Sequence, residues 1–312
     1  MNDKLTASQS KIWLLTASVG VLLTICGHSS WLTTLLTAAV CGIVSACSLG
    51  YGSGKMPKWL CVAELLWLAL FLGGIALQSE TCWKSKSVIP VIPIVLLLLS
   101  AWGAQYGAER VGRVSALLSW LILPICSLVF LAGAKSVNFE WVDNTAQMSD
   151  WLLPAVLLLP CLGLFIPNQQ TKACRPIIII IAVMAIAVSV WLDAALGISV
   201  SRSAENSFCE YSKSVTLFGV AERFEALVAC VLTGSWFSLF TIILSSAYHL
   251  AESVLAGWGR RAVWCCATLS GFIMCILHIP AEILAVGNLL FWGFVPILSQ
   301  GIDGEKKREK KP

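Results

Sequence analysis

Residues 176–190 read PIIIIIAVMAIAVSV, a stretch without a charged side chain, and the apolar run continues to residue 199 with one acid, Asp193. An apolar segment of about 20 residues crosses the roughly 30 Å hydrocarbon core of a bilayer as an α-helix. A helix satisfies its own backbone hydrogen bonds, which lipid cannot do. The stretch therefore predicts a membrane-spanning helix, and Asp193 is interpreted as a residue near the outer interface.

The whole chain has the composition of this segment. Of its 312 residues, 58% are hydrophobic and 12% are charged, and the mean hydropathy is +0.83. A soluble domain has about half apolar and a quarter charged residues. We expect an all-α integral membrane protein whose surroundings are membrane lipid, and the small net charge of +4 gives no reason to expect a nucleic acid partner.

Ten apolar runs predict about ten transmembrane helices. We expect the first run to be retained as a span because no small-residue cleavage site follows it. The runs make up a permease-like domain over residues 1–300, followed by a basic cytoplasmic tail over 301–312. Their predicted bounds are 11–27, 31–51, 59–77, 88–107, 113–134, 151–167, 176–199, 219–248, 262–280 and 283–299.

The basic residues predict the orientation of these helices. With the N-terminus in the cytoplasm, 15 of the 21 lysines and arginines fall in inside segments and 6 in outside segments. Cytoplasmic loops of membrane proteins carry such an excess of Lys and Arg. We therefore expect a multi-pass protein of the cell membrane with both termini in the cytoplasm.

Helix breakers gather in the sixth apolar run. Pro154, Pro160, Gly163 and Pro167 lie within fourteen residues of each other, and the first run carries the milder sequence Ser18-Val19-Gly20. Interrupted helices are tolerated in a membrane where protein or water satisfies the freed backbone groups. Interruptions at matching positions of two halves are typical of transporters with inverted repeats. The pattern predicts a five-plus-five inverted repeat of the LeuT type, with interrupted helices 1 and 6 and a binding site near mid-membrane.

Charged and hydroxyl side chains within the spans leave alternatives open. Glu64 is interpreted either as a carboxylate that faces an internal wet cavity or an interfacial lysine, or as a proton or substrate site. Glu222 and Glu225 either complement the dipole at the start of the eighth helix or form an ion-paired clamp. The hydroxyl residues of the eighth span indicate close helix packing or a water-lined path. They are Thr233, Ser235, Ser238, Thr241, Ser245 and Ser246.

The cysteines and histidines show no spacing typical of a metal site, and we expect neither a metal nor a cofactor. Most of the 13 cysteines lie within apolar runs, where they pack as small apolar groups. Cys82 and Cys209 fall in segments predicted to lie outside, where they could pair. No catalytic motif is present, so we do not expect an enzyme.

Several stretches, in order along the chain, resemble the spore germination permease family. This family provides the membrane subunits of nutrient germinant receptors and belongs to the amino acid–polyamine–organocation superfamily. The similar stretches are LTASQ at 5–9, SWL at 30–32, WGAQYGAERVGR at 102–113 running into LILP at 121–124, and FGVAERFEAL at 218–227 followed by Trp236.

The resemblance implies a receptor subunit of the inner spore membrane that acts with other germinant receptor subunits in a hetero-oligomer. Its ligand would be a small nutrient such as an amino acid, bound between helices one, three, six and eight. In that arrangement Ser18, Gly20, Pro160 and Gly163 offer backbone groups, while Glu64 and Ser235 line the cavity. Structural or gating roles then fall to Arg110, Arg113, Glu222, Arg223 and Glu225.

Two other functions remain open on the same fold. The first is an ion-coupled secondary amino acid transporter, in which Glu64 is the deep carboxylate available for coupling. The second is a structural subunit whose shortened helices 1 and 6 no longer form a pocket.

Overall fold

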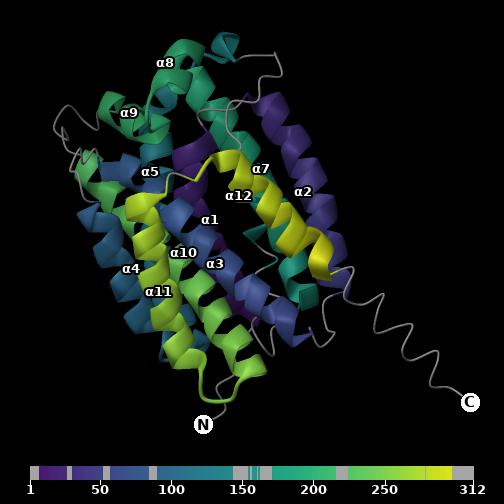
Figure 1. Cartoon of the computed structure of the whole chain (residues 1–312). Helices are drawn as coiled ribbons and strands as arrows, with labels where there is room; N and C mark the ends of the chain where they lie inside the picture. The colour runs from purple at the N-terminus through teal and green to yellow at the C-terminus, as the bar shows by residue number, and fades with distance from the viewer. Residues whose placement is uncertain are drawn as a thin grey trace, which may run out of the picture.

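The computed structural model describes residues 7–26, 30–51, 57–83, 90–142, 154, 157–159, 161, 171–215, 224–277 and 279–296. Every regular element in these ranges is helical, and the long helices pack into one bundle (Figure 1). The prediction of an α-helical membrane fold is confirmed at this level. The long helices are α1 (Ala7–Ile25), α2 (Trp31–Tyr51), α3 (Lys58–Ser79), α4 (Val91–Ala104), α5 (Ala108–Ala132), α7 (Thr171–Leu196), α10 (Phe224–Val254) and α11 (Gly259–Ile276), and the shorter helix α12 (Ala281–Asn288) follows them.

Short helical turns connect or extend these helices. The 3-10 turns are η2 (Glu80–Trp83), η3 (Gly133–Ser136) and η4 (Phe139–Trp141), and the short α-helices are α8 (Ile198–Ser203) and α9 (Ser207–Ser214). The last element, η6 (Leu289–Phe294), is a π-helix that continues α12.

Within the described ranges, six helices are long and apolar enough to cross a membrane, and Val91–Ala104 and Ala281–Phe294 form shorter apolar helices. Arg260 and Arg261 in the first turn of α11 lower the hydropathy of that helix. The sixth predicted span, 151–167, lies mostly outside the described residues. The structure thus supports a multi-span membrane protein, and the number of ten crossings stays a prediction.

Prolines and glycines fix where helices begin. Pro57, Pro90 and Pro280 directly precede α3, α4 and α12, at positions where the missing N–H of proline costs no hydrogen bond. Gly107 has a φ of 97° before α5, and Gly257 has a φ of 82° in the turn between α10 and α11. Only glycine adopts these positive angles readily, so both turns depend on it.

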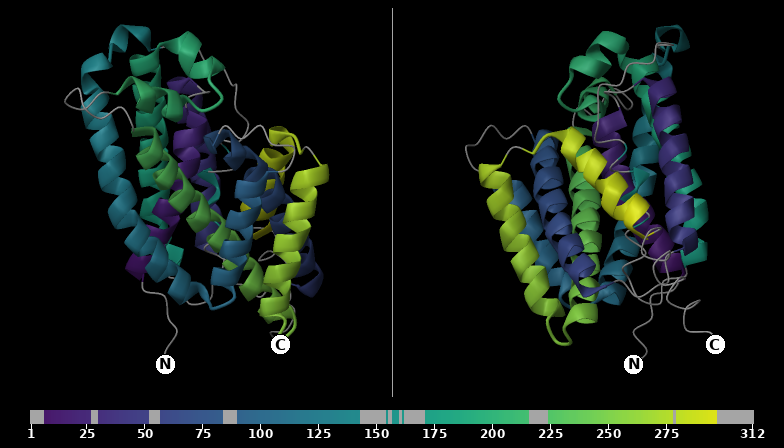
Figure 2. Two further views of the ribbon diagram at one scale, coloured as in Figure 1. Left: turned by 90° about the vertical axis from the view of Figure 1, so that its left-hand side faces the viewer. Right: turned by 45° about the vertical axis from the view of Figure 1, so that its right-hand side comes forward.

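Helix α10 is the central helix of the bundle. It packs against α1, α3, α4, α5 and α11, whereas α2 packs mainly against α7. Both views of Figure 2 place α8 and α9 at one end of the bundle and the α10–α11 turn at the other. We call these the α9 end and the turn end.

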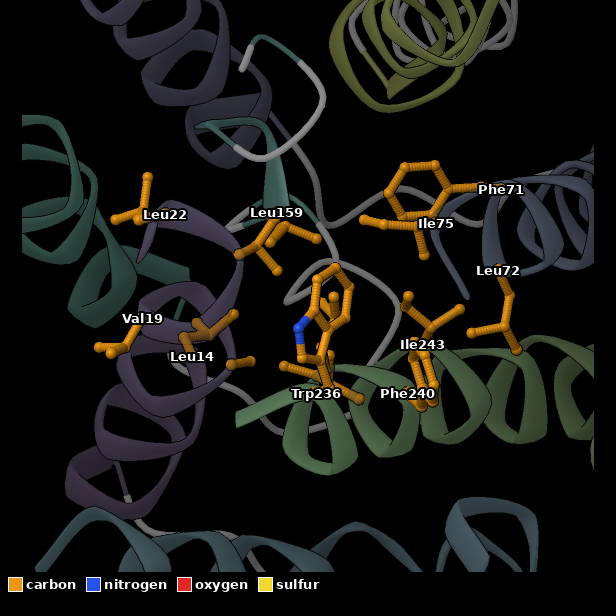
Figure 3. Packing of buried hydrophobic residues seen from close by; sticks show 14 of the residues in the cluster. Leu14, Val19, Leu22, Phe71, Leu72, Ile75, Leu159, Trp236, Phe240 and Ile243 are labelled. Carbon is orange, nitrogen blue, oxygen red and sulfur yellow. The ribbon is translucent and has the colours of Figure 1, made fainter. Parts of the chain in front are cut away.

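The core at the centre of the bundle is aromatic and aliphatic. The side chain of Trp236 is fully buried in a cluster that includes Leu14 of α1, Phe71 of α3 and Leu159. Figure 3 shows Leu159 beside the Trp236 indole, between the side chains of α1 and those of α3. Leu157, Leu158 and Leu159 are at most 3% exposed, so the described part of the sixth apolar run lies inside the bundle.

The first helix departs from the predicted interruption. α1 is continuous from Ala7 to Ile25, so the break expected around Ser18 and Gly20 is wrong. The hydroxyl of Ser18 donates to the carbonyl of Leu14 at 2.8 Å, and that of Thr24 donates to the carbonyl of Gly20 at 2.7 Å. These polar side chains are therefore satisfied by the preceding turn of an intact helix.

Candidate functional site

Two of the predicted ligand residues meet where α1 crosses α10. A Cβ atom on Gly20 would lie 2.4 Å from Cβ of Ser235, so the two helices touch at this glycine. About two turns away along α1, the indole N–H of Trp13 donates to the carbonyl of Ser238 at 3.2 Å. Gly20 and Ser235 thus lie in a closed contact that leaves no room for a ligand between them.

The other hydroxyl residues of α10 mostly bond to their own helix. Thr233, Ser238, Thr241 and Ser246 each donate to a carbonyl three or four residues earlier, at 2.6 to 3.0 Å. Small hydroxyl residues arranged in this way allow close approach of neighbouring helices. The structure thereby supports the packing interpretation of this polar set over the water-lined path.

Glu64 lies in a separate polar cluster between α3 and the last helix. Its side chain is fully buried, and its Oε1 accepts a hydrogen bond of 2.7 Å from the indole N–H of Trp292. Its Oε2 has no hydrogen-bond partner among the described residues. One turn further along α3, the Trp67 indole donates to Oδ1 of Asn288 at 2.9 Å. Trp292 lies in the π-helix η6, and such π-helical turns occur frequently at functional sites.

The structure does not bring Glu64 to Ser235. Cys61, one turn before Glu64, hydrogen-bonds Ser253 near the end of α10. Ser253 lies 18 residues after Ser235 in the same helix, which corresponds to about 27 Å. Glu64 is therefore near the turn end of the bundle, on the order of 20 Å from Ser235. The two residues cannot line one small cavity.

A cavity of about 380 Å³ lies at the α9 end of the bundle, between η2, α9 and the first turns of α10. This volume falls within the roughly 300–1,000 Å³ typical of small-molecule sites. We call it the outer cavity. It is lined by Cys82, Cys209, Ser212, Lys213, Glu225, Ala226 and Ala229.

Cys82 connects this cavity to the buried core. Its sulfur accepts hydrogen bonds from the indole N–H of Trp236 at 3.3 Å and from the side-chain amide of Asn206 at 3.5 Å. The Oδ1 of Asn206 in turn accepts from the backbone N–H of Cys209 at 3.1 Å and caps α9. One asparagine thus holds both cysteine-bearing segments.

Tyr211 fixes α9 against the bundle. Its hydroxyl donates to the carbonyl of Phe130 at 3.3 Å and accepts from the indole N–H of Trp191 at 2.9 Å. Gly133 makes this contact possible, because a Cβ there would lie 2.0 Å from the Tyr211 hydroxyl. Burial raises the pKa of Tyr211, so the phenol stays neutral and keeps its proton to donate. The wall of the outer cavity is therefore well anchored.

Among the described residues that line it, the outer cavity has one charge of each sign. The ammonium group of Lys213 donates to Glu210 at 2.7 Å, and its side chain is about one-third exposed. An ammonium group has three donors, so this contact leaves donors for a ligand. Glu225 lies on the opposite wall in the first turn of α10. A carboxylate and an ammonium group on the same small molecule match this pair of charges.

The two predicted arginines of α5 lie apart from both clusters. Arg110 stacks over the Tyr106 ring with its guanidinium carbon 5.5 Å from the ring centroid, and Arg113 pairs with Glu109 in the same turn of α5. Both arginines are exposed. Pro160, Gly163, Glu222 and Arg223 are outside the described residues. Asp193, predicted at the interface, is fully buried in α7.

Sequence reasoning missed the partners that complete both sites. Trp292 and Asn288 read as ordinary residues of an apolar run, and nothing in their spacing links them to Glu64 or Trp67. Lys213 and Ser212 lie in a short polar segment, for which the sequence predicts only a position outside the membrane. A charged residue next to Cys209 was the available signal for a site there.

Comparisons with known proteins do not identify the chain. No protein-family model matches the sequence, and no curated protein matches it. Within the described part of the chain, no group of three or more His, Cys, Asp or Glu side chains could hold a metal ion. The resemblance to the spore germination permeases therefore rests on the stretches quoted above, and the function has to be argued from the site.

Proposed function

We propose that this protein is the membrane subunit of a spore nutrient germinant receptor and that it binds a small amino-acid-like zwitterion in the outer cavity. The observation that carries the proposal is the placement of Lys213 and Glu225 in one cavity of about 380 Å³. The ammonium of Lys213 suits the carboxylate of an amino acid, and the carboxylate of Glu225 suits its amino group. Ala226 and Ala229 leave space for a small side chain.

The helix contacts support the five-plus-five architecture behind this proposal. If residues 151–167 count as the sixth span, then α10 is the eighth and α11 the ninth. The contact of α3 with α11 then joins the third and ninth spans, and its equivalent after a shift of five spans is the contact of the eighth with the fourth, α10 with α4. The contact of α2 with α7 joins the second and seventh spans, which exchange places under the same shift. An inverted repeat predicts such equivalence of contacts under a shift of five spans.

Helix α10 is the element through which ligand binding affects the rest of the protein. A ligand shifts a conformational equilibrium only by the difference in its affinity for the two states. Cys82 lines the cavity and also accepts a hydrogen bond from Trp236, whose indole packs in the centre of the bundle. Movement of η2 or α9 on ligand binding therefore changes a contact of the central helix, which is the element positioned to pass the signal to partner subunits.

Binding of amino acids to the purified protein in detergent tests this proposal. Isothermal titration calorimetry with a panel of amino acids should show saturable binding of at least one of them. Lys213→Gln and Glu225→Gln should each weaken it about tenfold or more, since hydrogen bonds to charged groups contribute roughly 1.5–3 kcal/mol. Lys135→Gln and Glu140→Gln, both exposed outside the cavity, are matched controls and should leave it unchanged.

A second function, an ion-coupled amino acid carrier, is favoured by one observation. Glu64 is a fully buried carboxylate in a membrane helix with one oxygen that lacks a partner among the described residues. Intramembrane ionisable residues often mark ion or proton pathways. Counterflow of radiolabelled amino acid in proteoliposomes distinguishes the functions: saturable exchange that is lost in Glu64→Gln supports a carrier, and binding without exchange supports the receptor.

A further inference from the structure

A long apolar groove runs along the outside of the bundle between α2 and α7. Its volume is about 620 Å³, and all the residues that line it are apolar. Figure 1 and the right-hand view of Figure 2 show the two helices side by side at the edge of the bundle. We call this the α2–α7 groove. It belongs to neither the outer cavity nor the Glu64 cluster.

Small residues at every fourth position of α2 keep the groove open. Ala38, Gly42 and Ala46 form its α2 side, and a Cβ on Gly42 would meet only a methyl group of Ile178 at 3.7 Å. The residues at the two edges of the groove are exposed on the surface of the bundle: Ile43 is 66% exposed and Ile179 is 67% exposed. Both helices belong to the candidate membrane spans. The groove therefore opens toward lipid.

The length of the groove corresponds to one leaflet. On α7 it extends from Pro176, where the candidate span begins, to Ile186. Ten helical residues cover about 15 Å, which is half of the roughly 30 Å hydrocarbon core. The helices are antiparallel, because Thr34 at the start of α2 hydrogen-bonds Ser189 in the second half of α7 at 3.2 Å. Thus the groove begins at the N-terminal end of α7, beside the C-terminal half of α2, and extends about 15 Å along both helices.

The end of the groove where Pro176 lies adjoins basic residues in the sequence. Lys172 and Arg175 belong to the first two turns of α7, and Lys58 opens the helix that follows α2. The sequence has no acidic residue in 168–176 or 49–58, so neither segment carries a charge that offsets its own basic residues. The positive-inside pattern predicts that this end is cytoplasmic. Basic residues at the cytoplasmic end of a site between helices are typical of binding sites for anionic lipid headgroups.

We propose that the α2–α7 groove binds an anionic phospholipid, with one acyl chain along the small residues of α2 and the headgroup phosphate at the N-terminal end of α7, whose sequence contains Lys172 and Arg175. A transmembrane helix of a partner protein is the other occupant that small residues accommodate. The lipid is favoured because the groove is about as long as one leaflet is thick and because basic residues adjoin its Pro176 end in the sequence. A partner helix would continue across both leaflets.

Native mass spectrometry of the full-length protein in detergent, titrated with phosphatidylglycerol or phosphatidylcholine of the same acyl chains, tests this inference. The wild type should retain phosphatidylglycerol at least tenfold better than phosphatidylcholine. Two kinds of variant should reduce that preference below about threefold. Ala46→Leu fills the groove from an exposed position, and the pair Lys172→Gln and Arg175→Gln removes the charge.

Matched controls separate the groove from general effects. Gly271→Leu places a leucine on α11, where nothing lies within 4 Å of a new Cβ, and Arg260→Gln with Arg261→Gln removes a basic pair elsewhere at the turn end. Both controls should keep the preference, and excess inorganic phosphate should not displace the lipid. An unchanged preference in Ala46→Leu, equal retention of the two lipids by the wild type, or loss of the preference in the controls would overturn the proposal. It would likewise be overturned if Ala46→Leu changed the oligomeric state while lipid retention stayed the same.

Discussion

The indole N–H of Trp292 donates to Oε1 of Glu64 across 228 positions of sequence, at 2.7 Å in the fully buried interface of α3 with η6. The same two elements are joined by the edge-to-face contact of Phe71 with Trp292, whose ring centroids are 4.8 Å apart. A carboxylate within a membrane helix costs about 2.5–3.5 kcal/mol on insertion scales. The protein therefore retains Glu64 at a cost in stability, which the Trp292 hydrogen bond reduces.

Substitutions at this pair should differ in their effect on stability. Trp292→Phe removes the indole donor and leaves both carboxylate oxygens without a partner among the described residues, so it should destabilise the protein by about 1–3 kcal/mol. Glu64→Gln keeps an acceptor oxygen for Trp292 and has no charge to desolvate, so it should be as stable as the wild type or more stable. Thermal unfolding in detergent measures both, with Trp120→Phe as the control, since Trp120 is 81% exposed. A Trp292→Phe variant as stable as this control would contradict the role of the hydrogen bond.

The close contact of α1 with α10 predicts that position 20 does not accommodate a side chain larger than that of glycine without a loss of stability. Gly20→Ala places a methyl group 2.4 Å from Cβ of Ser235 and should lower the free energy of unfolding by about 1–3 kcal/mol. Gly271→Ala in open space should be neutral or slightly stabilising, because alanine favours helix more than glycine. Adding Ser235→Gly to Gly20→Ala removes the clash and should recover part of the loss. Without any recovery in the double variant, the close contact would not be the cause.

A thiol in the outer cavity should react with reagents in the external water. Cys209 lines the cavity and is partly exposed, whereas Cys265 is exposed on α11, four residues after Arg261 at the turn end, which the basic residues predict to be cytoplasmic. Reaction of a thiol requires its thiolate, which forms in water. A membrane-impermeant maleimide should therefore label Cys209 in intact cells, and Cys209→Ser should reduce labelling much more than Cys265→Ser does. Equal reduction by the two serine variants would contradict the assignment of an aqueous cavity at this end.

The two ends of the bundle should lie on opposite sides of the membrane. Glu205, in the link between α8 and α9, and Arg261, in the first turn of α11, are both exposed. In a Cys209→Ser background, Glu205→Cys should be labelled by the impermeant maleimide in intact cells, and Arg261→Cys only after permeabilisation. Epitope tags at the two termini should both be detected only after permeabilisation. Labelling of Arg261→Cys in intact cells would reverse the predicted orientation.

Hydropathy alone predicted most of the helices, because the burial of an apolar run in a bilayer depends on its own side chains. The predicted run 31–51 coincides with α2, and 59–77 lies within α3, which covers Lys58–Ser79. The interruption at Gly20 was wrong because glycine is compatible with two structures: a helix break and a close helix crossing. Only the position of Ser235 on the neighbouring helix distinguishes the two.

The candidate sites were less predictable, since each depends on contacts between distant segments. The position of Glu64 in an apolar run indicated a special carboxylate, but its partner is set by how α3 packs against η6. Similarly, the sequence allowed Cys82 and Cys209 to pair; the structure places both at one cavity, and the pairing stays a prediction. The π-helical turn that holds Trp292 has no signature in the sequence.

The central claim is that the outer cavity binds an amino acid through Lys213 and Glu225. The most direct test is calorimetric titration of the amino acid that binds best into the wild type, Lys213→Gln, and the control Lys135→Gln. The account predicts saturable binding that is weakened about tenfold or more by Lys213→Gln and unchanged by Lys135→Gln. Binding of equal strength in all three proteins, or no binding of any amino acid to the wild type, would contradict it.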